Sequence, residues 1–426
     1  MQEDFLHYVW QFKKFNLSSA ETVSGLPLNI LHFGTPNALS GPDFFNARLE
    51  IGEQQWAGNV EIHINSSDWY VHGHEVDPAY DNVILHVVWN HDIEVFRKDN
   101  TVVPVLELKN IVHNCSFSKY ESLMNGKSTK WINCERDFSA FSDFEMDHWL
   151  ERLYVERLQE RSDIIHKMLQ VSSNNWEEVL FRMIAKSFGL NVNAGSFLDM
   201  ANSLPFSVLR KLRDQKKLEA LFLGQVGLLE QESEDVYYQE LKQEYAFLKH
   251  KYHLDRSGVA PVKFFRLRPD NFPTIRLAQL AALYTRREHL FSEVINTRSL
   301  HEMYDLFHVQ LSEFWETHYT FQKVHKRRKK QLTRNFIDLL VINTLIPLKF
   351  CFAQKQGQEN LEEVFELISN IEKEANQTIH HFEMLRPMVA SNALKSQALL
   401  HLKREFCDKN KCLKCGLGIK LLQGKV

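Results

Sequence analysis

The sequence predicts an α+β protein in which a strand-rich N-terminal part precedes a large all-helical domain. In the first 113 residues, apolar and polar side chains alternate with the period of two that is typical of half-buried strands. From residue 143 onward, apolar residues recur at helical spacing between charged faces. These helical segments have no fixed repeat period, which argues against a solenoid.

The N-terminal part should form a mixed sheet with an opening helix over residues 3–16. Gly52 to Gln55 forms the turn of a hairpin. The nearly all-apolar segment at 83–89 is typical of a strand that is covered on both faces. The expected strands are residues 26–33, 45–51, 59–64, 83–89 and 102–111.

Four segments follow from these patterns. Residues 1–113 form the α/β domain, and residues 114–142, rich in Ser, Asn and Lys, form a linker or surface excursion. Residues 143–400 form the helical domain, in which Asn174 or Asn175 caps the next helix. Residues 401–426 form a cysteine-containing tail.

Charge is divided unevenly along the chain. The net charge is −3, but residues 1–113 carry six basic against fifteen acidic side chains, which leaves the remainder at +6. An acidic domain does not attract nucleic acid by its overall field. It can bind a phosphate backbone when metal ions occupy its carboxylates and the basic half supplies positive surface.

The sequence gives two expectations about location. The acidic start MQEDF lacks the basic region of a signal peptide, which predicts a cytoplasmic protein whose six cysteines are reduced or metal-bound. We expect no membrane segment, because the longest apolar run, at residues 339–348, is interrupted by Asn343, Thr344 and Pro347.

The hairpin carries the densest chemistry in the chain. Glu61 and His63 are two residues apart on one strand and therefore point to the same face. Asp43 has the parity of the apolar face of its own strand, so it reaches Glu61 only if Phe44 and Phe45 form a bend or bulge. Otherwise Glu50 is the partner of Glu61, and Asp43 caps a turn. Carboxylates on neighbouring strands can hold Mg²⁺ or Mn²⁺.

At Pro42-Asp43 and Glu61-Ile62-His63 the sequence resembles the PD-(D/E)xK nuclease superfamily. The resemblance implies a restriction-endonuclease-like mixed sheet flanked by helices and a metal-dependent nuclease that cuts DNA or RNA. Asp43 and Glu61 would be metal ligands. His63 stands where that family has lysine, and it would orient the water, act as base, or ligate Mn²⁺ or Zn²⁺. The alternative is a catalytically inactive nuclease-like scaffold for nucleic-acid or protein interaction.

Further imidazoles and aromatic rings follow the hairpin. His72, His74 and Asp77 are candidate metal ligands in a loop that rims the site, although His-x-His is also common in ordinary loops. His86 lies in an apolar strand, which favours a core histidine bonded to a backbone group. Trp69, Tyr70 and Tyr80 would either stack on bases or pack in the core.

Two basic segments are candidates for nucleic-acid binding. The alternatives, which the sequence favours, are internal ion pairs for the first segment and a solvated face for the second. Their residues are Arg266, Arg268 and Arg276, then Lys326, Arg327 and Arg328.

Cys407, Cys412 and Cys415 form C-x4-C-x2-C near the end of the chain. The spacing suggests a clip for Zn²⁺ or an iron–sulfur cluster, with Cys351, His401 or another histidine as the fourth ligand. The alternative is a reduced tail. The segments RLRPDNFPTIRLAQLA and NTLIPL, taken with these cysteines and the hairpin, are similar to one bacterial family of uncharacterised proteins across essentially the whole chain.

Overall fold

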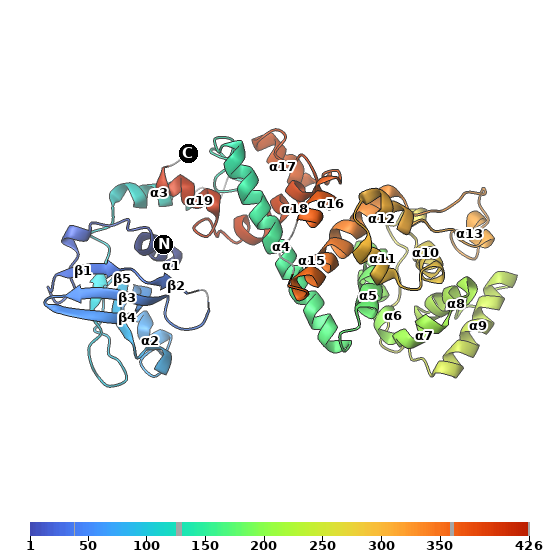
Figure 1. Ribbon diagram of the computed structural model, residues 1–426, viewed down its shortest axis with the longest axis horizontal. Helices are drawn as coiled ribbons and strands as arrows, with labels where there is room; N and C mark the ends of the chain where they lie inside the picture. The colour runs from blue at the N-terminus through green and yellow to red at the C-terminus, as the bar shows by residue number, and fades with distance from the viewer. Residues whose placement is uncertain (38, 125–129, 358–361, 425–426) are drawn as a thin grey trace. The chain divides into compact units, whose positions relative to one another are not determined.

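The computed structural model describes residues 1–37, 39–124, 130–357 and 362–424. The protein is α+β, with an N-terminal mixed sheet followed by many helices, as predicted (Figure 1). It divides into two compact units, one of residues 1–149 and 402–426 and the other of residues 150–401. The C-terminal segment therefore belongs to the first unit.

The sheet has six strands in the order β1-β3-β4-β5-β6, with β2 paired to β3. β3 runs antiparallel to its neighbours β1 and β4. β4, β5 and β6 run parallel to one another. The link from β4 to β5 contains the short helix α2 (Asp68–Val71). The strands are β1 (Leu28–His32), β2 (Thr35–Pro36), β3 (Phe44–Ile51), β4 (Gln54–Asn65), β5 (Val83–Asn90) and β6 (Val105–Glu107).

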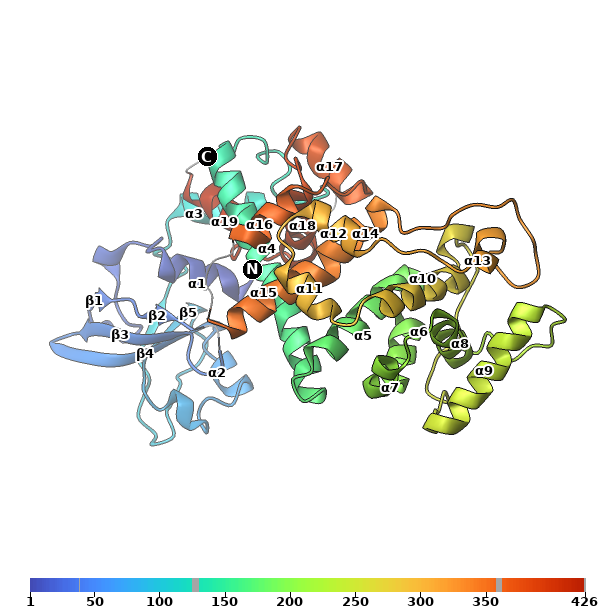
Figure 2. The ribbon, with the colours of Figure 1, turned by 45° about the vertical axis from the view of Figure 1, so that its right-hand side comes forward.

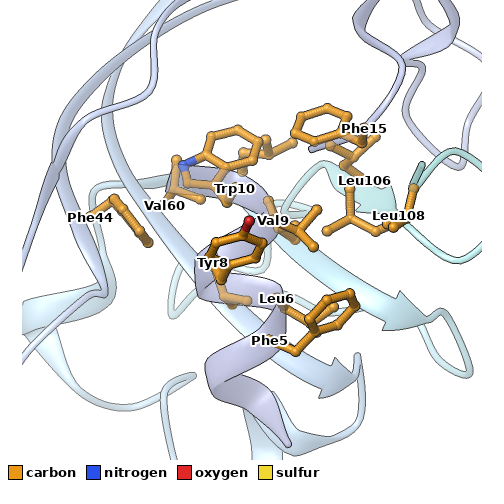
Figure 3. Close-up of a cluster of buried hydrophobic side chains, with 14 of the residues drawn as sticks. Phe5, Leu6, Tyr8, Val9, Trp10, Phe15, Phe44, Val60, Leu106 and Leu108 are labelled. Atoms are coloured by element: carbon orange, nitrogen blue, oxygen red, sulfur yellow. The ribbon is translucent and has the colours of Figure 1, made fainter. Parts of the chain in front are cut away.

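Helix α1 (Glu3–Gln11) packs its apolar side on the sheet (Figure 3). Phe5, Val9 and Trp10 are fully buried there, and the indole Nε1 of Trp10 donates a hydrogen bond to a backbone carbonyl at 3.0 Å. The helix ends earlier than expected, because Lys13 adopts a positive φ of 55° and turns the chain toward the sheet. The apolar residues that follow the helix pack in the core without continuing the helix.

Residues 58–63 of β4 are buried on both faces, although alternation predicted one solvated face. Trp69 and neighbouring valines form a second apolar cluster, separate from the one beneath α1. Glu61 and His63 on β4 are consequently only 5% and 1% exposed. A period of two distinguishes the faces of a strand but does not show what later parts of the chain will cover.

The segment expected as a linker contains the helix α3 (Asn114–Met124), which packs beside the C-terminal helix α19 (Gly416–Gln423) (Figure 2). Both helices lie in the first unit. Residues 125–129 of the expected linker lie outside the described residues.

Helices make up the second unit, and α4 begins within the first. The side chain of Asn175 accepts a hydrogen bond from the Glu178 N–H and caps α5, as predicted. The helices are α4 (Asp143–Val171), α5 (Trp176–Phe188), α6 (Leu190–Ser203), α7 (Phe206–Lys211), α8 (Gln215–Gln225), α9 (Val236–Tyr252), α10 (Pro273–Arg286), α11 (Leu290–Asn296), α12 (Leu300–Leu306), α13 (Glu313–Thr317), α14 (Arg334–Leu340), α15 (Ile346–Lys355), α16 (Glu362–Ser369), α17 (Gln377–Leu385) and α18 (Ala393–His401).

Helices α14 and α15 join through a π-helical turn into one helix, Arg334–Lys355, that is long and apolar enough to span a bilayer. The most apolar 18-residue window of this helix is 72% buried inside the protein, so its apolar side chains pack in the protein core. Pro347 lacks the N–H that would bond the carbonyl of Asn343, and Arg161 donates to that oxygen at 3.2 Å instead.

Candidate functional site

A β-bulge in β3 brings Asp43 to Glu61. Phe44 pairs with Val60 and Ala47 pairs with Gly58, so β3 contains one more residue than β4 between these two pairs. The extra residue is accommodated by the left-handed Asn46, whose φ is 59°. The condition that we set for contact between Asp43 and Glu61 is thus met.

One hydrogen bond links Asp43 to Glu61, and a second links Asp43 to the neighbouring Ile62. The backbone N–H of Asp43 donates to Glu61 Oε2 at 3.1 Å, and the N–H of Ile62 donates to Asp43 Oδ2 at 3.0 Å. The alternative partner, Glu50, lies opposite Gln55 near the hairpin turn and accepts a hydrogen bond from Asn29 at 3.2 Å. The pair across the strands is therefore Asp43 and Glu61.

Three imidazoles gather beside the other oxygen of Glu61. Nε2 of His74 and of His63 lie 3.2 and 3.6 Å from Glu61 Oε1. Nδ1 of His72 lies 3.0 Å from His63 Nε2. One nitrogen from each of the three rings falls within 4.8 Å of the others, which is close enough to share a metal ion.

The loop after β4 positions two of these rings. The turn of α2 lets the His74 N–H donate to the Trp69 carbonyl at 3.0 Å, which folds the loop back over β4. The His74 ring then stacks on Tyr80 at 3.7 Å between centroids. His74 is 8% exposed, whereas His72 is exposed at the edge of the site.

Burial sets the protonation of the inner residues. It raises the pKa of Glu61, with the nearby His74 opposing. It lowers the pKa of His63 to about 4, so His63 is neutral at pH 7 and retains one unprotonated ring nitrogen.

His86 lies directly behind His63. It is fully buried, as expected of a core histidine, but its Nε2 lies 2.8 Å from His63 Nδ1 instead of on a backbone group. Burial, with His63 adding to it, holds the pKa of His86 well below its ordinary value. His86 therefore fixes the orientation of His63 through a neutral contact.

His7 on α1 is a member of the site that the sequence analysis missed. Its Nε2 lies 3.3 Å from Asp43 Oδ2 and 3.7 Å from Glu3 Oε1. Burial disfavours the charge on His7, but the nearby carboxylates of Asp43 and Glu3 together outweigh burial and raise its pKa to about 9. The spacing of Glu3 and His7 on an expected helix was a usable signal, but nothing local linked that helix to Asp43.

Comparison with known proteins gives one positive finding. A family model described as "Protein of unknown function (DUF2851)" matches residues 3–377. The chain belongs to this family. No curated protein and no solved structure matches the chain.

The DUF2851 match confirms the similarity to an uncharacterised family. It includes the hairpin and the basic segments and ends before the cysteine motif. The motif is therefore interpreted from the structure of this chain alone.

Other residues of this DUF2851 protein lie outside the cluster. Asp77 is exposed and accepts a hydrogen bond from the Ala79 N–H at 2.9 Å, which caps a short turn. Trp69 is fully buried, and its indole donates to the Phe96 carbonyl at 3.1 Å. Tyr70 donates to the Glu94 carbonyl at 3.2 Å.

The basic candidates divide into two groups. Arg276 is buried, with its guanidinium 3.7 Å from the centroid of the Phe336 ring. Arg327 donates to Glu316 at 2.6 Å, and Arg328 lies 3.4 Å from Asp270. These three arginines have protein partners. Arg266, Arg268 and Lys326 are exposed.

Cys407, Cys412 and Cys415 line one small cavity of about 20 Å³. Neither residue proposed as a fourth ligand lines it. Cys351 contacts the Ser162 carbonyl, and His401 lies 3.7 Å from Glu156.

Proposed function

We propose that this protein is a metal-dependent phosphodiesterase, a nuclease of DNA or RNA with a restriction-endonuclease-like N-terminal domain. Its site would comprise Asp43, Glu61 and His63, completed by His72 and His74. The observation that carries the proposal is the β-bulge, which puts Asp43 against Glu61 at the point where three imidazoles converge. Such a bulge places a specific side chain at a specific point, as bulges beside active sites do.

The side chains fit a divalent transition metal. Glu61 Oε1 and one nitrogen from each of the three histidines form the donor set. Nε2 of His74 is buried and makes no hydrogen bond, although it lies 3.2 Å from Glu61 Oε1. Imidazole ligands favour Mn²⁺ or Zn²⁺ over Mg²⁺. When bound, such a metal would polarise the phosphodiester and lower the pKa of an attacking water.

The rest of the chemistry belongs to the chain. A neutral His63 that donates its Nδ1–H to His86 leaves Nε2 unprotonated and directed toward His72 and Glu61. His63 is then a metal ligand, or a base that accepts the proton of the water.

His7 would provide a cation next to Asp43, on the acidic side of the site. It lies between Asp43 and Glu3, and its side chain is 28% exposed, so it is accessible to a phosphate oxygen. A lysine at position 7 should preserve this charge, whereas alanine should remove it.

The competing function is an inactive nuclease-like scaffold, and one observation favours it. Each carboxylate already accepts a backbone hydrogen bond, Asp43 from Ile62 and Glu61 from Asp43, without a metal. Carboxylates that accept backbone hydrogen bonds in this way are also expected if their role is purely structural.

An activity assay separates the two functions. Labelled single-stranded and duplex DNA and RNA are incubated with the full chain and Mn²⁺, Zn²⁺ or Mg²⁺. We expect cleavage, strongest with Mn²⁺ or Zn²⁺, and a fall of about 100-fold or more in Glu61→Gln, because a ligand and its charge are lost. Glu50→Gln is the matched control, since it removes a carboxylate of the same hairpin away from the site.

Three results would contradict the nuclease: cleavage that survives Glu61→Gln, cleavage lost equally in Glu50→Gln, or no cleavage with any metal. Nucleic-acid binding without cleavage would establish the scaffold instead.

A further inference from the structure

A fourth cysteine lies with the C-terminal three. Cys134 lines the same small cavity as Cys407, Cys412 and Cys415, although it precedes them by more than 270 residues. All four belong to the unit of residues 1–149 and 402–426. Two distant segments of the chain therefore meet at their thiols.

Tight backbone turns present these thiols. The Asp137 N–H donates to the Cys134 carbonyl at 3.0 Å, and the Asn410 N–H donates to the Cys407 carbonyl at 3.2 Å. The N–H of Cys415 donates to the carbonyl of Cys412 at 3.2 Å, which closes the C-x2-C loop. Each thiol thus stands at or beside a turn that directs it into the cavity.

Hydrogen-bond donors surround the sulfur atoms. The side-chain amide of Asn133 donates to Cys412 Sγ at 3.2 Å. The backbone N–H groups of Leu417 and Gly418 lie near the sulfur of Cys415 and favour its thiolate form. Such bonds stabilise the negative charge of a thiolate ligand and tune the metal that it holds.

Gly418 is required for this arrangement. A Cβ added at position 418 would lie 2.1 Å from the carbonyl oxygen of Cys412, far inside van der Waals contact. The glycine lets the backbone approach close enough for its N–H to reach Cys415. The spacing C-x2-C-G-x-G therefore has a geometric reason.

The remaining wall of the cavity is apolar and includes Leu123, Ile132 and Leu402. Four thiols that line one cavity, with the Asn133 amide donating to one of them, have little packing advantage over aliphatic side chains. A bound cation accounts for both features.

We propose that Cys134, Cys407, Cys412 and Cys415 form a four-thiolate metal centre for a single Zn²⁺ ion or an iron–sulfur cluster. Four thiolate ligands would make it a closed, structural site. It would fasten the C-terminal segment to the body of the first unit, where α19 already packs on α3. The centre is independent of the proposed nuclease chemistry.

The test uses the full chain purified without oxygen and dialysed against EDTA, which removes weakly held metal. We expect about one zinc per chain, or iron with equimolar acid-labile sulfide and visible absorption. Cys134→Ser should lose this metal. Cys351→Ser should keep it, because Cys351 is buried but does not line the cavity. Retention of full metal by Cys134→Ser, or absence of zinc and iron from the wild type, would overturn the proposal.

A second measurement covers the case in which Cys134→Ser does not fold. X-ray absorption at the zinc or iron edge of the wild type should show sulfur alone from the protein, at about 2.3 Å. Nitrogen or oxygen in the first shell would overturn the four-cysteine assignment.

Discussion

Acidification of the metal-free protein should selectively destabilise the hairpin region. His63 is 1% exposed and has a pKa of about 4, against 6.5 for an ordinary histidine. Because the pKa of His63 is lower in the folded state, this side chain is protonated between pH 6.5 and 4 in the unfolded chain but stays neutral in the folded protein. The contribution of His63 to stability is therefore full above pH 6.5 and is lost as the pH falls toward 4, whereas Glu61, whose pKa is raised, acts in the opposite direction.

The magnitude follows from the pKa difference. At 1.36 kcal/mol per decade, a decrease of the pKa from 6.5 to about 4 corresponds to about 3 kcal/mol. His86 acts in the same direction. His7 acts oppositely, because its pKa is raised to about 9, so its contribution is complete below pH 6.5 and disappears as the pH rises through 9.

Hydrogen exchange is measured by mass spectrometry at each pH with EDTA present. It gives the free energy of local opening for peptides from β4 and β5. His63→Gln should reduce the decline between pH 6.5 and 4 by about 3 kcal/mol. His7→Gln is the matched control: it should preserve that decline and alter only the range from pH 6.5 to 9. An unchanged slope in His63→Gln, or a flattened slope in His7→Gln, would refute the reasoning.

Three further predictions concern neighbouring parts of the structure. Gly58→Ala should destabilise the first unit by about 1–3 kcal/mol in urea denaturation, because a Cβ there would lie 2.6 Å from the Asn82 carbonyl oxygen; no change would contradict this packing. Lys349→Met should destabilise the second unit by about 3 kcal/mol, because the ammonium group donates to three backbone carbonyls at and after the end of α11; a neutral effect would show that those carbonyls find other partners. Asp43→Asn should lower the pKa of His7 below 9 in an NMR titration, because one of its two anionic neighbours is removed; an unshifted pKa would place the charge of His7 under the control of Glu3 alone.

Local patterns were sufficient for several features of this protein. Alternation predicted the strands of the hairpin, and the parity of Asp43 showed that its contact with Glu61 would require a bend or bulge, which the structure contains. These features depend on residues a few positions apart. The fold class followed from the change of period near residue 143.

Features created by distant segments could not be predicted in the same way. The covering of β4 depends on Trp69 and on a loop that folds back over the strand. His7 reaches Asp43 only because α1 packs against the sheet, and Cys134 lies in a segment without periodicity. Each requires knowledge of tertiary packing, which neither spacing nor propensity contains.

The most direct test of the proposed metal site is an anomalous difference map from crystals of the full chain soaked in Mn²⁺. We predict a peak within coordination distance of Glu61 Oε1 and of ring nitrogens of His63, His72 and His74, and its loss in Glu61→Gln. A map with no peak among these four side chains at saturating Mn²⁺, in crystals that bind the ion elsewhere, would contradict the proposed metal site.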